Sequence, residues 1–299
     1  MKILFVVNPI SGGVDKKDFI TEATETCLFY NISFSVFYTT GKKDKQKLKA
    51  VLKKFKPDKV ASVGGDGTIL FTATALMDTP YPMGIIPLGS ANGMATELSI
   101  NPAPIEALKD IIMSAMIRGL DLLKINKKYY TMHIGDVGIN ANIVKSYSKD
   151  PNRGMMTYAK YFFEEIKSLK NFTVTVKTPN SEYSSEVYMA AICNSRKYGS
   201  GVPLDLSGNP MDGKFEIVLL EQIDIPSIIS AGLAAFNEKF YTNQQRKVIT
   251  TDKAELLFSK PRLLQLDGEV IKKYKKISVE ILPGAVQLIT TKANKNILN

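Results

Sequence analysis

A glycine-rich turn around one carboxylate follows the apolar residues 59–63 and reads Gly64-Gly65-Asp66-Gly67-Thr68. Glycine lets backbone N–H groups approach an anion closely, so such a turn before a helix is typical of a phosphate site. We expect Thr68 to cap a helix over residues 69–77. A carboxylate among phosphates needs a divalent cation or a hydroxyl between them, which makes Asp66 a candidate for contact with a metal. A plain turn with a capping aspartate is the alternative.

Two further turns of small and polar residues end apolar segments in the first hundred residues. Asn8-Pro9-Ile10-Ser11-Gly12-Gly13 follows residues 2–7, and Pro87-Leu88-Gly89-Ser90-Ala91-Asn92-Gly93 follows residues 84–86. In open parallel sheets, ligands bind outside the carboxyl ends of the strands. The three turns are therefore predicted to meet in one crevice.

These turns stand in order with three more motifs, and the set resembles the diacylglycerol kinase catalytic domain superfamily, which includes bacterial lipid kinases, sphingosine kinases and ceramide kinases. The further motifs are Gly135-Asp136-Val137-Gly138-Ile139-Asn140, Asp212-Gly213 and Asp267-Gly268-Glu269. The resemblance covers nearly the whole chain. It implies phosphoryl transfer from ATP with Mg²⁺ to a lipid hydroxyl. The glycine-aspartate-glycine turn alone is shared with NAD kinases and is similar to one in phosphofructokinases.

The resemblance also implies roles for individual residues. Asp66 would bond the metal or water bound to it, and Asp267 would be the general base that deprotonates the acceptor hydroxyl. A hairpin turn is the alternative interpretation of Asp267 and the glycine after it. The residues expected to line the nucleotide site are Asn8, Ser11, Gly12, Thr40, Gly64, Gly65, Gly67, Thr68, Ser90, Asn92 and Glu269.

A second, structural Mg²⁺ is implied near residue 212. Asp212 would hold it together with the backbone carbonyls of Asn209 and Lys214. Met211 stands where some relatives carry a second acidic residue, and an Asp-Gly hairpin turn is the alternative. The same segment looks like a Walker A motif, but Phe215 replaces the Ser or Thr that would bind Mg²⁺, and a strand rather than a helix is expected to follow.

The composition favours two domains and an anionic partner. The 299 residues are 44% hydrophobic, and Lys plus Arg exceed Asp plus Glu by 39 to 29, a formal net charge of +10. The cysteines, Cys27 and Cys193, lie far apart, which predicts reduced thiols. The first apolar segment is too short for a signal peptide and no run is long enough to span a membrane, so we expect a cytoplasmic protein.

Lysines crowd residues 42–59, where Leu48, Val51, Leu52 and Phe55 keep helical spacing. This pattern predicts a basic amphipathic helix, either an ordinary helix covering a sheet or one that docks on anionic lipid. Nucleic acid is not expected, because no aromatic ladder or known reading motif accompanies the lysines. The expected partners are ATP, a lipid acceptor and, peripherally, an anionic membrane surface, with a homodimer left open.

The hydrophobic pattern predicts an α/β fold of two domains. Residues 1–121 alternate strands and helices, which indicates a parallel sheet covered on both faces. Residues 122–287 carry short alternating segments, which indicate an antiparallel sandwich or barrel. The resemblance implies that the first domain is Rossmann-like, similar to NAD kinases, and binds the nucleotide, that the second is a β-sandwich that binds the lipid, and that the tail 288–299 returns to the first domain. The expected strands are 2–8, 32–39, 59–63, 84–87, 172–176, 185–192, 215–220, 254–258 and 277–281. The expected helices are 15–29, 43–55, 68–77, 91–98, 104–117, 154–168 and 226–238.

Several functions stay open at the level of sequence. Ser90 and Gly93 stand where many bacterial diacylglycerol kinases carry Thr and Asp, and serine there is similar to sphingosine and ceramide kinases, so a sphingoid base or ceramide is an alternative acceptor. An NAD kinase is disfavoured because that family's second signature is absent. A non-catalytic, nucleotide-regulated lipid-binding module is disfavoured because Asp66 and Asp267 are both present. The single histidine, His133, is expected in a strand with a structural role.

Overall fold

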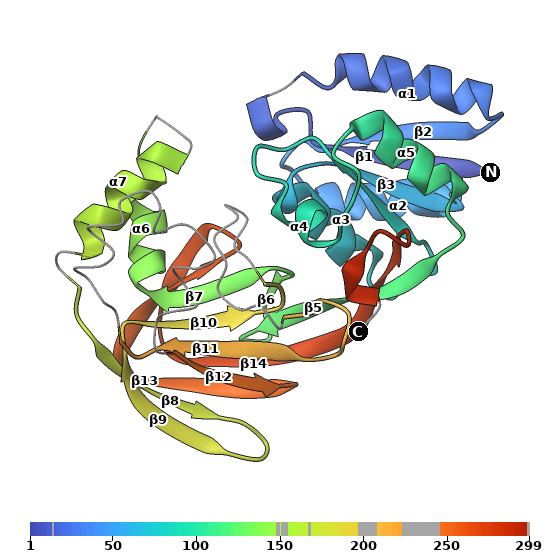
Figure 1. Cartoon of the computed structure of the whole chain (residues 1–299). Helices are drawn as coiled ribbons and strands as arrows, with labels where there is room; N and C mark the ends of the chain where they lie inside the picture. The colour runs from blue at the N-terminus through green and yellow to red at the C-terminus, as the bar shows by residue number, and fades with distance from the viewer. Residues whose placement is uncertain are drawn as a thin grey trace. The chain divides into compact units, whose positions relative to one another are not determined.

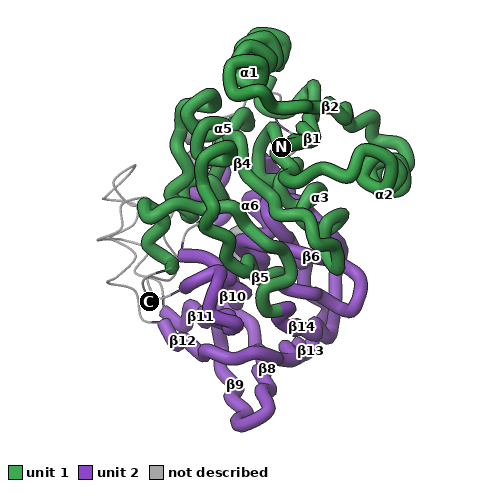
Figure 2. Tube along the Cα trace, turned by 90° about the vertical axis from the view of Figure 1, so that its right-hand side faces the viewer, with its two compact units in different colours: residues 1–122, 283–299 green, residues 123–282 purple. Residues whose placement is uncertain are grey.

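The computed structural model divides the chain into two compact units, coloured separately in Figure 2, and describes residues 1–13, 15–147, 150, 155–166, 169–196, 208–222 and 246–297. Unit 1 comprises Met1–Leu122 and Pro283–Asn299, and unit 2 comprises Leu123–Leu282. The chain passes between the units inside two strands, β5 (Ile117–Ile125) and β14 (Glu269–Ile289).

Unit 1 is a parallel sheet covered by helices (Figure 1). Its strands are β1 (Lys2–Val7), β2 (Ser33–Tyr38), β3 (Lys59–Gly64) and β4 (Met83–Pro87). They pair in the order β2-β1-β3-β4, and the last residues of β14 add to β4. β3 and β4 are almost wholly buried, because a parallel sheet is covered on both faces. The predicted fold class of this half is confirmed.

Five helices complete unit 1. They are α1 (Lys17–Phe29), α2 (Asp44–Phe55), α3 (Asp66–Leu76), α4 (Gly93–Glu97) and α5 (Pro104–Met113). α1 packs beside α5, and α2 packs beside α3. The apolar core under α1 and α5 includes Phe5, Phe19 and Ile111. The cysteine in α1, Cys27, belongs to the same core, and burial raises the pKa of its thiol to about 11.

The bounds of two helices differ from those predicted. α3 begins at Asp66 rather than at Thr68, because Gly65 is extended and ends the strand-to-helix turn, and Thr68 makes no capping bond. α5 ends at Met113 rather than at residue 117. The ammonium of Lys59 donates hydrogen bonds to the carbonyl oxygens of Ile111 and Ser114 at 2.7 and 2.9 Å, which satisfies the open end of the helix. This contact comes from the sheet, so the helical pattern alone could not locate it.

Unit 2 is an antiparallel β-sandwich, as predicted. Its sheet runs β12-β11-β10-β7-β13-β14, β8 joins it along β13 with β9 outside, and β5 pairs with β6. The further strands are β6 (Tyr129–Thr131), β7 (Ile134–Gly138), β8 (Phe172–Lys177), β9 (Glu182–Val187), β10 (Met189–Cys193), β11 (Phe215–Leu220), β12 (Arg246–Thr251) and β13 (Lys253–Leu266). The helices described in this unit are α6 (Ile139–Tyr147) and α7 (Met155–Ile166).

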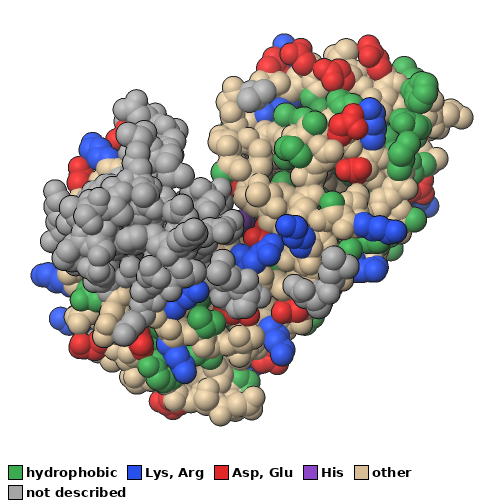
Figure 3. Space-filling model, in the orientation of Figure 1, with side chains coloured by type: hydrophobic (Ala, Val, Ile, Leu, Met, Phe, Trp, Pro, Cys, Tyr) green, Lys and Arg blue, Asp and Glu red, His purple; other side chains and the backbone are tan. Residues whose placement is uncertain are grey.

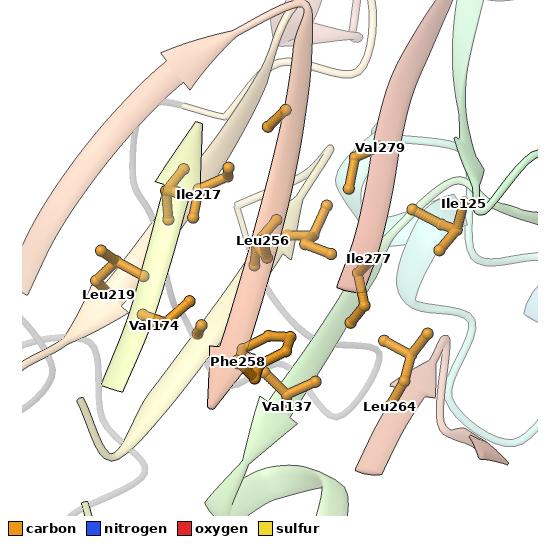
Figure 4. Packing of buried hydrophobic residues seen from close by; sticks show 14 of the residues in the cluster. Ile125, Val137, Val174, Ile217, Leu219, Leu256, Phe258, Leu264, Ile277 and Val279 are labelled. Carbon is orange, nitrogen blue, oxygen red and sulfur yellow. The ribbon is translucent and has the colours of Figure 1, made fainter. Parts of the chain in front are cut away.

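The core of unit 2 collects one face of each strand, because side chains alternate along a strand. Figure 4 shows Val174, Ile217, Leu256 and Ile277 pointing toward one another. The segment 185–192, predicted as one strand, is two: β9 pairs with β8, whereas β10 pairs with β7 and β11. The helix predicted at 226–238 lies outside the described residues.

The basic segment forms α2, and the apolar side chains along one side of this helix pack inside unit 1. Leu48 and Leu52 are buried, while Lys45, Lys49 and Lys53 are exposed. The helix therefore covers the sheet in the ordinary way, and only its lysines are open to a partner. In the described part of the chain, no helix combines the length and apolar character needed to cross a bilayer.

Candidate functional site

The three turns after β1, β3 and β4 meet in unit 1 through their glycines. A Cβ on Gly12 would lie 2.9 Å from the carbonyl carbon of Gly89. A Cβ on Gly89 would lie only 2.3 Å from Cα of Gly65. One glycine from each turn is thus in backbone contact with the next, and no side chain fits between them. The three turns therefore meet through main chain, and main-chain N–H groups at such turns are a common means by which proteins bind phosphate groups.

Asp66, the first residue of α3, joins the second turn to the third. Its Oδ2 accepts a hydrogen bond from the N–H of Gly93 at 3.0 Å, and its Oδ1 accepts one from the N–H of Met94 at 2.8 Å. The carboxylate therefore caps α4, a contact that the sequence did not indicate. Each oxygen has a second lone pair, so the same carboxylate can also bind a hydrated cation.

The third turn is shaped by Asn92, which has a left-handed backbone with φ of 53°. Its Oδ1 accepts a hydrogen bond from the N–H of Gly89 at 2.8 Å, and its Nδ2 donates to the carbonyl of Gly89 at 3.1 Å. The Asn92 amide is thus used within the turn. The neighbouring Ser90 is exposed and its hydroxyl makes no hydrogen bond with a described residue.

The first turn is held by Ser11 and by Lys16, a residue outside the sequence motifs. The Ser11 hydroxyl donates to the carbonyl of Asn8 at 3.1 Å. The ammonium of Lys16 donates to the carbonyl of Ser11 at 2.6 Å, and burial lowers the pKa of this lysine. Lys16 is only 3% exposed, and its ammonium group brings a positive charge to the turn. Its place in the sequence, between the glycine turn and the first helix, could have indicated this role.

Two threonines predicted for the nucleotide site differ in their surroundings. Thr68 is buried beside Gly64, and its hydroxyl has no hydrogen-bond partner among the described residues. Thr40 follows β2, and its hydroxyl donates to Oδ1 of Asp44 at 2.7 Å, which fixes the start of α2. Thr68 is therefore the threonine whose hydroxyl is still available, next to the glycine turn.

In unit 2, Asp267 lies in a two-residue hairpin turn between β13 and β14. Asp267 and Gly268 have φ values of 47° and 84°, as a type I′ turn requires. The carboxylate folds back onto the bend Thr131–Ile134. Its Oδ1 accepts hydrogen bonds from the Thr131 hydroxyl at 2.5 Å and the Ile134 N–H at 3.2 Å. Asp267 is therefore part of a hairpin turn and also has a carboxylate held in one orientation, so the two interpretations of this residue do not exclude each other.

Two buried polar residues, Gln265 and Asp136, hold this hairpin in place through hydrogen bonds. The amide of Gln265 donates to the carboxylate of Asp136 and accepts a hydrogen bond from the Gly268 N–H at 2.9 Å. Gln265 and Asp136 are 1% and 0% exposed. The motif that begins at Gly135 thus contributes to the position of Asp267. Glu269 is exposed, and its carboxylate has no hydrogen-bond partner within the described residues.

His133 lies in the bend between β6 and β7, so the prediction that it lies in a strand is wrong. The hydrogen bonds to Asp267 explain the bend, because they turn the Thr131–Ile134 backbone toward the hairpin. His133 is 4% exposed, its Nδ1 lies 2.7 Å from Oγ of Ser195, and its carbonyl accepts the N–H of Asn194 at 2.9 Å.

The predicted metal loop consists of two successive side-chain turns. Oδ1 of Asn209 accepts the N–H of Met211 at 3.1 Å, and Oδ1 of Asp212 accepts the N–H of Lys214 at 2.9 Å. Oxygen donors of this kind suit Mg²⁺, and each has a lone pair left. The described residues contain no group of three His, Cys, Asp or Glu side chains able to hold a metal. Phe215 begins a strand, so the Walker A interpretation is excluded.

Comparison with known proteins gives two family matches and close agreement in fold. The family model of the diacylglycerol kinase catalytic domain matches residues 2–125, and that of the YegS C-terminal NAD kinase beta sandwich-like domain matches residues 136–290. A Yersinia enterocolitica protein named "Probable lipid kinase YegS-like" is 28% identical over 235 residues, 75% of this chain and 76% of its own. The crystal structure of a diacylglycerol kinase from Bacillus anthracis str. Sterne has a TM-score of 0.72 at 17% identity, over 98% of both chains, which shows a shared fold.

Proposed function

Because the chain belongs to the lipid kinase family that joins a diacylglycerol kinase catalytic domain to a YegS C-terminal domain, we propose that it phosphorylates the primary hydroxyl of diacylglycerol or a related lipid. ATP would be the donor and Mg²⁺ its counterion. The observation that best supports this proposal is the backbone contact of Gly12, Gly65 and Gly89, which brings the main chain of the three turns together.

Unit 1 would bind the nucleotide. Backbone N–H groups at the glycine turns and at the start of α3 face an anion favourably, and Lys16 adds a positive charge. The buried Thr68 hydroxyl, which has no partner among the described residues, is an available donor beside Gly64. Asp66 is the carboxylate of this unit that would hold Mg²⁺, directly or through water, and the cation would neutralise the charge that develops on the phosphates.

Unit 2 would supply the base and receive the lipid. Three donors from the Thr131–Ile134 bend, the Thr131 hydroxyl and the N–H groups of Met132 and Ile134, hold the Asp267 carboxylate. A general base must have a fixed direction toward the proton that it removes. The proton of the acceptor hydroxyl would move to Asp267 as the oxygen attacks the γ-phosphorus. The leaving group would be ADP.

The lipid itself is tested with a total lipid extract. We expect mass spectrometry after incubation with the protein, ATP and Mg²⁺ to show diacylglycerol converted to its phosphate. The exposed Ser90 keeps a sphingoid base or ceramide as the second candidate acceptor, and the same experiment identifies phosphorylated forms of either. Formation of NADP from ATP and NAD, or tight lipid binding without ATP consumption, would contradict the proposal.

Asp66→Ala should lower both stability and Mg²⁺-ATP binding. The N–H groups of Gly93 and Met94 lose their acceptor, which should cost about 1–3 kcal/mol of unfolding free energy. Asp66→Asn is the matched variant, because it keeps one acceptor oxygen but removes the charge. We expect the asparagine variant to be more stable than the alanine variant and equally weak in nucleotide binding, measured by denaturation and calorimetry. Wild-type Mg²⁺ dependence in both variants would limit Asp66 to capping α4.

Asp212→Ala tests the second, structural Mg²⁺ that we propose. The melting temperature of the wild type should rise with Mg²⁺ in the absence of nucleotide, since a ligand of the folded state stabilises it by mass action. The variant should lose this rise, and a matched exposed control, Asp252→Ala, should keep it. A plain turn would cost about 1 kcal/mol or less and leave the Mg²⁺ response of Asp212→Ala intact.

A further inference from the structure

A cluster of two tyrosines and two lysines lies at the turn end of the β5–β6 hairpin in unit 2. The ammonium of Lys128 lies 5.0 Å from the ring centroid of Tyr129, at the start of β6. The ammonium of Lys272 lies 5.0 Å from the ring centroid of Tyr274, in β14. The two tyrosine hydroxyls interact with each other. We call these four residues the tyrosine–lysine cluster.

The cluster carries positive charge that no acidic side chain of the described residues neutralises through an ion pair. Neither Lys128 nor Lys272 forms an ion pair with a described residue, whereas Lys276, farther along β14, pairs with Glu255 at 2.6 Å. The hydrogen bond from Tyr274 and the two lysines together lower the pKa of Tyr129. For Tyr274 the main effect is burial, which raises its pKa to about 12. The surface thus offers two exposed lysine side chains, one of them hydrogen-bonded to Tyr129, and two amphipathic rings.

The position of the cluster connects it to the candidate base. Tyr129 precedes Thr131 by two residues of the same strand, a distance of about 7 Å. The Thr131 hydroxyl donates to the Asp267 carboxylate. The cluster and Asp267 therefore lie in the same unit, and β6 carries both Tyr129 and the threonine that bonds the Asp267 carboxylate.

We propose that the tyrosine–lysine cluster is the surface by which the protein docks on a bilayer containing anionic phospholipids. Ammonium groups are attracted to anionic headgroups, and tyrosine rings favour the boundary between headgroups and acyl chains. The idea rests on the proposed function to the extent that a lipid kinase must reach an acceptor in a membrane. Docking here brings the headgroup layer to the strand that holds the base.

Other surfaces fit a catalytic docking role less well. Lys and Arg side chains occur on both units in Figure 3, so the net charge of +10 alone singles out neither. The lysines of α2 stand on a helix whose Leu48 and Leu52 are buried and whose Val51 and Phe55 are half-buried. Within the described residues, none of these lysines lies over an aromatic ring of the same helix. The exposed Leu28 and Phe29 end α1, and its 13 residues place them about 20 Å from the glycine turn at the other end.

The test compares two double variants that each remove two positive charges. Lys128→Gln with Lys272→Gln alters the cluster, and Lys49→Gln with Lys53→Gln alters α2. Binding is measured by cosedimentation with phosphatidylcholine vesicles, with and without phosphatidylglycerol, and without ATP. We expect the cluster variant to lose about tenfold to thirtyfold in partitioning onto anionic vesicles, and the α2 variant less than threefold. An equal loss in both variants, or none in the cluster variant, would overturn the proposal.

Two further arms separate docking from other causes. Lys128→Arg with Lys272→Arg keeps the charge, so it should bind like the wild type; a loss as large as that of the glutamine variant would contradict an electrostatic surface. Soluble glycerol phosphate, added at the concentration of accessible headgroups, should not displace the protein from vesicles. Displacement would indicate a site for free phosphate instead. Because no turnover is measured, failure to find a phosphorylated lipid would leave these outcomes unchanged.

Discussion

Asp267→Asn should lower kcat by a factor of about 10² to 10⁴ and change the affinity for ATP little. Asparagine tolerates the backbone φ of 47° at this position, so the hairpin should persist. Its single amide oxygen can still accept the bonds from the Thr131 hydroxyl and the Ile134 N–H. What the variant loses is the ability to take a proton, so chemistry should suffer more than binding.

The measurement is steady-state kinetics with the acceptor that the lipid-extract experiment identifies, together with calorimetric titration of ATP. Asp252→Asn is the matched control, since it removes the same charge from an exposed position in unit 2. It should keep wild-type kcat. If Asp267→Asn also kept it, another group would have to be the base. If both kcat and the melting temperature fell together, the carboxylate would be holding the bend and nothing more.

Gly89→Ala should disrupt the proposed nucleotide site, with at least a tenfold loss of ATP affinity. The new methyl would sit 2.3 Å from Cα and 2.8 Å from the nitrogen of Gly65, so one of the two turns must move. Overpacking of this kind costs about 1–3 kcal/mol of stability. Displacement of the turns would also redirect the N–H groups that are proposed to meet the phosphates.

Gly67→Ala is the contrasting variant in the same region. A Cβ at this position meets no atom within 4 Å, and the residue lies inside α3, so alanine should stabilise the folded state by up to about 1 kcal/mol. Any loss of ATP affinity would then measure how closely the phosphates approach the start of α3. Normal stability and normal ATP binding in Gly89→Ala would show that the contact of the turns does not matter to the nucleotide.

The fold class could be predicted because its signals are local and repeated. In unit 1, β3 is an apolar run followed by a helical segment, and in unit 2, β8 alternates buried and more exposed residues. The meeting of the three glycine turns also followed, since parallel strands place their carboxyl ends at one edge. The end of α5 could not be predicted, because it depends on Lys59 from the sheet, 52 residues away from Ile111.

The hydrogen-bond partners of individual polar groups could not be predicted from the sequence. Whether the Asp66 carboxylate caps its own helix or the next one depends on the path of a turn 27 residues later. The partners of Asp267 are separated from it by 136 and 133 residues, and a motif carries no information about them. Motifs thus indicated which side chains matter, whereas only the folded backbone determines what each one bonds.

The division of unit 1 into two stretches of sequence has a consequence for biosynthesis. Leu288 of β14 pairs with Met83 at the edge of the β1–β4 sheet, and the side-chain amide of Asn296 donates to the carbonyl of Glu97 at 3.0 Å. These residues leave the ribosome only after all of unit 2. The growing chain would therefore complete its β-sandwich while β4 still presents an open edge, and such edges recruit wrong partners. Unit 1 would therefore close only after the residues that follow unit 2 have been made.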